Sequence, residues 1–441
     1  MGSVNRDAGL ARIVGPVALA ASMISIVVGA GIFLVPAKLS QLLGSLAPLA
    51  VLACAVAIGA IGLCMAEGGS RVPSSGGIYA CVTAAFGPCA GYVAGTVFWV
   101  SNVLACGGVS SALGDTVAAV LPASARVVAH GAVAAGAVIA ICAINIGGIE
   151  RSIRLVSFST LAKLVPLAVF VGVGLCAIHG ENFVRPATIG AADVGQTLLL
   201  TLFAFQGFET SLSVGGEIRD PVRTIPLAIL LALSGVTVLY IAVQIIAQGI
   251  LGPALAHSVV PLADAMGRVS PALRVMMLVG TGLSMFGWLT SDLLGSPRIL
   301  FAFARDGLLP RALGRLTERS RAPYASIICY GAIAIALALS GSFADLAASA
   351  ALSLAFLYIA ACLASWQLAR RGIAQAGTAL GFRWIGVAAA IGVGSMLAVM
   401  TLASRTEILF LVVLTGLSLL GYLVQTRFYR LWTQLSMRPS R

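Results

Sequence analysis

Residues 27–36 read Val27-Val28-Gly29-Ala30-Gly31-Ile32-Phe33-Leu34-Val35-Pro36, in the middle of the first long apolar segment of the chain. Two glycines and a following proline weaken a helix, because each glycine costs roughly 1 kcal/mol relative to alanine and a proline costs about 3 kcal/mol. In hydrocarbon a freed backbone N–H or C=O costs several kcal/mol, so such breaks persist where they line a cavity or a site. The segment therefore predicts a ligand site at Gly29–Gly31. Alternatively, its small residues only allow helices to pack closely.

The composition is that of a membrane protein. Of the 441 residues, 59% are hydrophobic and 10% are charged, whereas soluble domains carry about 25% charged residues. The net charge of +12 is distributed singly or in short clusters between apolar runs, so the basic face of a nucleic-acid-binding protein is not predicted. The nine cysteines and three histidines show no CxxC pair or metal-ligand spacing, so we expect no disulfide framework, metal or other cofactor.

Twelve apolar runs are candidates for membrane spans, since about 20 residues cross a hydrocarbon core of about 30 Å. They lie at about residues 12–38, 46–66, 85–111, 127–148, 154–178, 194–216, 225–249, 272–303, 324–343, 346–368, 384–403 and 407–426. An even number of spans places both termini on one side, and most of the arginines fall in the connections on that side. By the positive-inside rule we expect both termini in the cytoplasm, in a bacterial inner membrane.

The sixth apolar run is interrupted like the first. It continues as Phe203-Ala204-Phe205-Gln206-Gly207-Phe208-Glu209, so that a polar pair and a carboxylate break an apolar helix. The two interrupted spans begin five spans apart, and this odd number would turn a second half built like the first upside down in the membrane. Interrupted segments at corresponding positions of two halves indicate a transporter site near the middle of the bilayer.

Several motifs resemble the signatures of the amino acid–polyamine–organocation transporter superfamily. They are found at residues 28–33, 73–79, 205–209, 217–226 and 304–307, in the order of that family. The resemblance implies an all-α integral membrane protein of twelve transmembrane helices, with a 5+5 inverted repeat of LeuT-like fold, broken helices 1 and 6, and two peripheral helices. The expected domains are residues 1–178 for the first repeat, residues 179–368 for the second, and residues 369–441 for the last two helices and a cytoplasmic tail.

The break in the first span predicts a site with two ends. The N–H groups of Ala30, Gly31 and Ile32 begin a half-helix whose dipole is equivalent to about +0.5 charge, and such an end binds carboxylates. The preceding half-helix ends in carbonyls near Ile26 and Val27, which suit an ammonium group. An α-amino acid carries both charges on one carbon, so the sequence predicts that this site binds a zwitterion.

The resemblance assigns further site residues in the sixth span and around it. In similar transporters carbonyls of this span, here those of Phe203, Ala204 and Gln206, also receive the substrate amine. Phe203, Phe98 and Trp288 match aromatic residues that close the pocket in that family, so we expect them to act as gates. Alternatively, these aromatic side chains only pack in the interior.

Three charged side chains, Lys163, Glu209 and Asp292, lie well away from the ends of the predicted spans. A charge at that depth costs at least about 2.5–3.5 kcal/mol, so Lys163 in the fifth span is expected to be functional. It resembles a lysine that some relatives use in place of a bound sodium ion, and its protonation would then couple protons to the broken first span. Alternatively, Lys163 extends back to the inner surface. Glu209 either holds the unwound backbone or relays a proton, and Asp292 either faces the pocket or pairs with Arg298.

Together these features predict a secondary active transporter and not an enzyme, since the sequence contains neither an HExxH nor a GxSxG motif. Its expected partners are a small-molecule amino acid, protons and the lipid bilayer, and the expected reaction is proton-coupled uptake. The third-span segment Val103–Gly108 is apolar and small, which favours a neutral or modestly polar side chain. We therefore expect uptake of a neutral amino acid or of a broad range of amino acids. The alternatives are an amino acid/amine exchanger and an amino-acid receptor that does not transport.

Overall fold

The computed structural model describes residues 14–73, 77–119, 121–147, 149–184, 189–305, 309–318, 320, 322–375 and 379–436. For residues 149–161, 213–217, 302, 305 and 426–436 it describes the backbone alone. Within these ranges the chain is helical and contains no strand, and one isolated bridge joins Val14 to Ile218.

The helices follow one another along the chain with short connections. The α-helices are α1 (Pro16–Val27), α2 (Gly31–Leu43), α3 (Ala47–Arg71), α4 (Gly77–Phe86), α5 (Pro88–Ala118), α6 (Ala123–Ile146), α7 (Ile149–Gly174), α8 (Ala191–Phe205), α9 (Pro221–Leu251), α10 (Pro261–Gly267), α11 (Pro271–Gly295), α12 (Pro297–Arg305), α13 (Tyr324–Ser340), α14 (Phe343–Arg370), α15 (Ile385–Thr401) and α16 (Arg405–Ser436). The 3₁₀ helices are η1 (Gly44–Leu46), η2 (Leu175–Ala177), η3 (Gly180–Asn182), η4 (Phe208–Glu217), η5 (Gly252–His257) and η6 (Arg311–Gly314).

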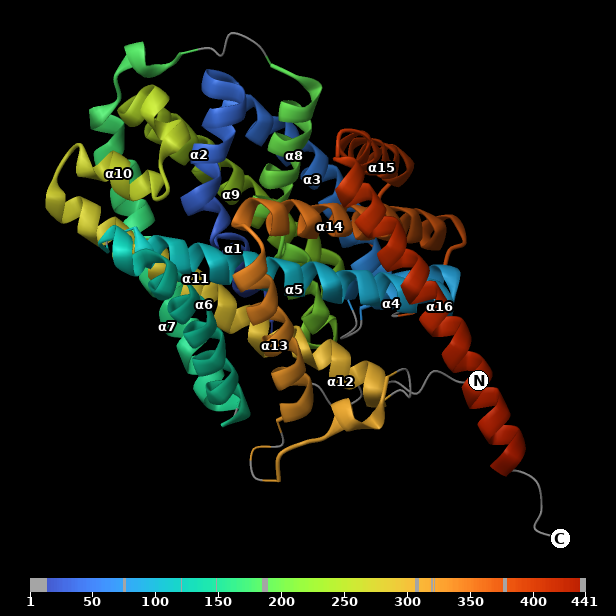
Figure 1. Ribbon diagram of the computed structural model, residues 1–441. Coiled ribbons are helices and arrows are strands. Elements are labelled where there is room, and N and C mark those ends of the chain that lie inside the picture. The colour runs from blue at the N-terminus through green and yellow to red at the C-terminus, as the bar shows by residue number, and fades with distance from the viewer. Residues whose placement is uncertain are drawn as a thin grey trace.

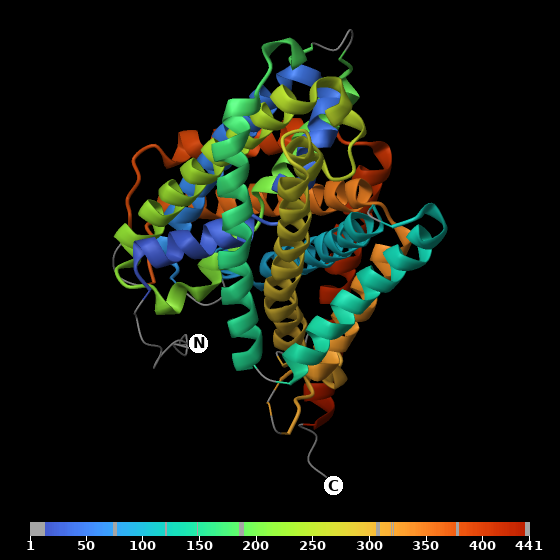
Figure 2. The ribbon, with the colours of Figure 1, turned by 90° about the vertical axis from the view of Figure 1, so that its left-hand side faces the viewer.

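Helix α5 crosses the middle of the molecule and packs against α6, α13 and α14 (Figure 1). Helices α7 and α11 lie side by side along their lengths (Figure 2). The first two helices belong to different neighbours, because α1 packs on α9 while α2 packs on α8. Helix α16 runs along the outside, where it contacts α5 and α14 (Figure 1).

The outer surface is that of a multi-pass membrane protein. By length and composition alone, seven helical stretches in the described part of the chain can cross a membrane, and shorter apolar helices lie between them. Large apolar side chains are exposed on several of these helices, such as Leu230 and Val238 on α9 and Leu417 on α16. In water such a surface would be unfavourable, whereas lipid covers it without cost. The expected count of twelve spans stays a prediction.

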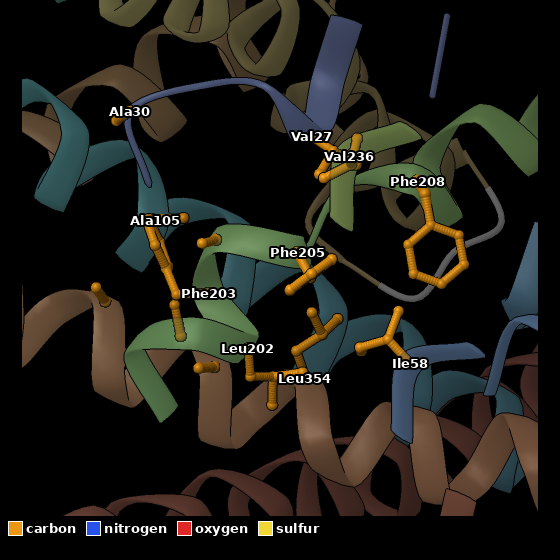
Figure 3. Close-up of a cluster of buried hydrophobic side chains, with 14 of the residues drawn as sticks. Val27, Ala30, Ile58, Ala105, Leu202, Phe203, Phe205, Phe208, Val236 and Leu354 are labelled. Atoms are coloured by element: carbon orange, nitrogen blue, oxygen red, sulfur yellow. The ribbon is translucent and has the colours of Figure 1, made fainter. Parts of the chain in front are cut away.

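The apolar segment quoted first contains two helices rather than one. Helix α1 ends at Val27 and α2 begins at Gly31, and Figure 3 shows Val27 and Ala30 at the two ends of the thin connection. Within this connection the Gly29 N–H donates a hydrogen bond to the Val27 carbonyl, two residues earlier, at 2.7 Å. Helix α2 continues through Pro36 to Leu43, so the interruption lies at the glycines and not at the proline.

A second interruption follows α8, which ends at Phe205, and η4 begins only at Phe208. Gln206 between them is extended, with φ −69° and ψ 156°. Gly207 has a φ of +114°, which glycine adopts readily because it has no Cβ.

The eighth expected span, residues 272–303, is divided in the structure. Helix α11 ends at Gly295 and α12 begins at Pro297. Proline at the first position of a helix is tolerated, since its missing N–H would have no partner in the helix there. The division leaves Ser296 between the two helices, next to the cavity described below.

Candidate functional site

The two interruptions touch each other. A Cβ on Gly207 would lie only 2.6 Å from Cγ2 of Ile26, so Ile26 at the end of α1 rests on bare backbone of the second interruption. Tyr240 of α9 joins the same two places, because its hydroxyl oxygen lies 2.9 Å from the Val27 carbonyl oxygen and 2.7 Å from that of Ala204. It can donate to either carbonyl. The ends of α1 and α8 are therefore held together by packing and by a shared donor.

A cavity of about 40 Å³ lies beside this contact. Four of the expected site residues line it, namely Ile26, Gln206, Glu209 and Trp288. Its remaining lining residues are Ser101, Asn102, Gly207, Thr210, Ser291, Asp292, Gly295, Ser296 and Leu354. A cavity needs roughly 10–15 Å³ to hold one water, so this one has room for a few waters but not for an amino acid.

Glu209 and Gln206 form the wall of the cavity that belongs to the second interruption. Both carboxylate oxygens of Glu209 lie 3.0 Å from the Gly207 nitrogen, and one of them also accepts a hydrogen bond from the Tyr358 hydroxyl at 2.9 Å. These are the contacts expected of a residue that holds unwound backbone. Gln206 is buried, and its Oε1 has no hydrogen-bond partner among the described atoms.

Trp288 of α11 closes another side of the cavity. Its indole lies against the first interruption so closely that a Cβ on Gly29 would be 2.4 Å from Trp288 Cδ1. Ser284, one turn earlier on α11, donates to the Gly29 carbonyl at 3.2 Å. The approach of this ring requires a glycine, so Gly29 serves packing as well as interrupting the helix.

Ala30, Gly31 and Ile32, which are expected to bind a carboxylate, do not line this cavity. Gly31 and Ile32 line a separate hollow together with Ala204 and Tyr240. The backbones of α2 and α8 nearly touch there, since a Cβ on Gly31 would lie 2.8 Å from the Ala204 Cα. Ala30 is buried at the end of the connection. In this conformation α8 covers the predicted carboxylate site.

Two of the three expected gates do not line the cavity. Phe203 is buried and packs edge-on against Phe343 of α14, with ring centroids 5.5 Å apart. Figure 3 shows it extending toward Ala105 of α5. Phe98 is partly buried against the core. Gating by these two residues stays a prediction, whereas Trp288 is at the cavity wall.

Lys163 of α7 is buried, with 2% of its surface exposed. Its Nζ donates to the carbonyl of Ser25, which lies in the last turn of α1. The C-terminal end of a helix carries partial negative charge and attracts a cation. The side chain therefore contacts the end of the interrupted helix, which argues against its extending to the membrane surface.

Several polar side chains of the cavity were not identified from the sequence. Ser101 and Asn102 come from α5, and Ser296 follows the end of α11. No shared motif marks them, and the available signal was only a single polar residue within an apolar run. Asp292 lines the cavity, and no ion pair in the described part of the chain includes it.

Comparisons with known proteins point to membrane transporters. The family model described as "Amino acid permease" matches residues 14–422. Uncharacterized transporters of Mycobacterium bovis and Mycobacterium tuberculosis are 34% identical over 325 residues, which is 70% of this chain and 70% of theirs. The serine/threonine exchanger SteT of Bacillus subtilis is 26% identical over 383 residues, covering 83% of this chain and 85% of its own.

Proposed function

Because this chain belongs to the amino acid permease family, we propose that it carries an α-amino acid across the membrane by alternating access. The observation that supports this most directly is the contact of Ile26 with Gly207 beside a cavity that is lined by several polar side chains. Irregular backbone at membrane depth is tolerated where it lines a cavity, and in transporters such backbone forms the substrate site. The small volume of the cavity means that its walls move apart when substrate enters.

The proposal includes the architecture expected from the sequence. Residues 1–178 and 179–368 would form two inverted repeats of five spans, and residues 369–441 two peripheral spans and a tail. The positions of the interruptions support it, since one follows α1 near the start of the first unit and the other follows α8 near the start of the second. The excess of arginine on one side supports cytoplasmic termini in a bacterial inner membrane.

The proposed substrate contacts are those of a zwitterion. The carboxylate would bind the N–H groups of Ala30, Gly31 and Ile32, which have no carbonyl partner within their own helix. The amine would bind carbonyls at the ends of α1 and α8, where the Tyr240 hydroxyl now donates to Val27 or Ala204. Substrate entry then requires α2 and α8 to separate.

We further propose that Lys163 couples transport to protons. A protonated Lys163 would stabilise the end of α1 through the Ser25 carbonyl, and loss of the proton would release it. We expect Lys163→Ala to abolish uptake driven by a pH gradient. Lys163→Arg should fail as well, because an arginine does not release its proton in a protein. Lys38→Ala is the matched control, since Lys38 is exposed on α2 and contacts Gln41.

The experiment is uptake of radiolabelled amino acids into proteoliposomes, with and without an inward pH gradient and with or without amino acid inside. Uptake that still follows the pH gradient in Lys163→Ala refutes the coupling. Uptake that needs internal amino acid indicates an exchanger, the second candidate, which the relative named as a serine/threonine exchanger supports. Binding without any flux indicates a receptor.

A further inference from the structure

The part of the cavity wall that α11 contributes holds a fixed carboxylate. Asp292 accepts hydrogen bonds from the Tyr330 hydroxyl at 2.6 Å and from the Ser296 hydroxyl at 2.7 Å, one on each carboxylate oxygen. Asn102 of α5 donates in turn to the Ser296 oxygen at 3.0 Å. Three helices, α5, α11 and α13, thus hold the Asp292 carboxylate in one orientation at the cavity.

The described lining of the cavity contains many acceptors and no cation. Two carboxylates, Asp292 and Glu209, line it, and no Lys or Arg is among the residues given above. A third acceptor, Oε1 of Gln206, is buried without a partner. Gln206 as a whole is only 8% exposed. An unpaired buried acceptor costs free energy, so a ligand that places a donor group at this wall would be stabilised by it.

A carboxylate has about four acceptor positions. The hydroxyls of Tyr330 and Ser296 occupy two of those of Asp292, and the Cys106 thiol of α5 hydrogen-bonds the same carboxylate. The hydroxyls that occupy these positions come from the protein itself. The remaining acceptor capacity of this partly buried carboxylate is best satisfied by a cation, because an unpaired ion removed from water is strongly unfavourable. A charged donor also makes a stronger bond to a carboxylate than a neutral donor does.

We propose that Asp292 determines substrate specificity, by binding a positively charged group at the end of the side chain of a basic amino acid. This inference rests on the proposed amino-acid site and extends it. The zwitterionic end of the substrate would occupy the two interruptions, and the side chain would extend toward α11. The apolar segment Val103–Gly108, which favours a neutral side chain, does not line the cavity, although its Cys106 hydrogen-bonds Asp292. Its neighbours Ser101 and Asn102 line the cavity instead.

The test compares L-lysine with L-norleucine, which has the same straight chain without the ammonium group, and with L-serine. Binding and uptake of each are measured on the full-length protein in proteoliposomes. We expect the wild type to prefer lysine. Asp292→Asn should weaken lysine about 10- to 100-fold, the usual effect of removing a hydrogen bond to a charged group, and leave norleucine unchanged. The control is Asp345→Asn, which removes an exposed carboxylate at the start of α14.

Tyr330→Phe provides a second variant, because it removes a donor that orients Asp292 and keeps the carboxylate. We expect it to lower the lysine-to-norleucine preference less than Asp292→Asn does. Retained norleucine binding shows that each variant is folded. Equal binding of lysine and norleucine by the wild type overturns the inference and leaves the proposed function intact. Preference for serine that survives Asp292→Asn overturns it too. Absence of binding and flux for every amino acid overturns the proposed function itself.

Discussion

Gly207 allows a direct test of the contact between the two interruptions. In Gly207→Ala the new methyl group would be 2.6 Å from Ile26 Cγ2, and overpacking of this kind costs about 1–3 kcal/mol. The φ of +114° adds a second cost, because a non-glycine residue in a sparsely populated region costs about 1–3 kcal/mol. The variant should therefore lose about 2–6 kcal/mol of stability.

The two costs separate in a double-mutant cycle. Ile26→Ala removes Cγ2. Because Ile26 is only partly buried, its own cost should lie at the lower end of the about 2–5 kcal/mol that large-to-small changes cost in a packed interior. With the smaller side chain present, Gly207→Ala keeps the backbone cost but loses the overlap. The double variant should then be about 1–3 kcal/mol more stable than the sum of the single changes.

The assay is reversible unfolding in mixed detergent micelles on titration with SDS, followed by tryptophan fluorescence. Gly235→Ala on α9 is the matched control, because Gly235 is exposed and no described atom lies within 4 Å of a Cβ placed there. That change should be neutral or stabilise the helix by about 1 kcal/mol. Additive effects of Gly207→Ala and Ile26→Ala, within about 0.5 kcal/mol, would show that the two residues do not pack as described.

Two further predictions concern hydrogen bonds that hold the interior. Tyr240→Phe removes the donor shared by the Val27 and Ala204 carbonyls and should cost about 1–3 kcal/mol, the usual penalty for leaving a buried acceptor without a partner; the SDS titration measures it. Glu67→Ala leaves Arg71 without its ion-pair partner. In the wild type the Arg71 Nε lies 2.7 Å from Glu67 Oε1, and the Glu67 side chain is fully buried. Breaking a buried pair in this way costs about 3–5 kcal/mol, which should appear as a lower thermal midpoint in detergent, and an unchanged midpoint would contradict a role of this pair in stability.

The two helix interruptions could be predicted from the sequence because the residues that cause them act locally. Gly29 and Gly207 weaken a helix wherever they occur, and a break in a long apolar run is visible without knowledge of any neighbour. Lys163 stood out for the same reason, since a charge in an apolar run has a cost that depends on depth rather than on a particular partner. The family motifs then indicated which kind of transporter carries two such breaks.

Only the tertiary structure could show which side chains share the cavity. Asp292 and Asn102 come from helices far apart in the chain, and they are linked through Ser296, which no local pattern marks. From the apolar segment Val103–Gly108 the sequence predicted a neutral side chain for the substrate. A run of small residues, however, gives no sign of which side chains of other helices line the same cavity. Hydropathy and backbone propensity act over a few residues and therefore specify spans and breaks. The polarity of a site depends on which faces of different helices meet, and this is decided by packing.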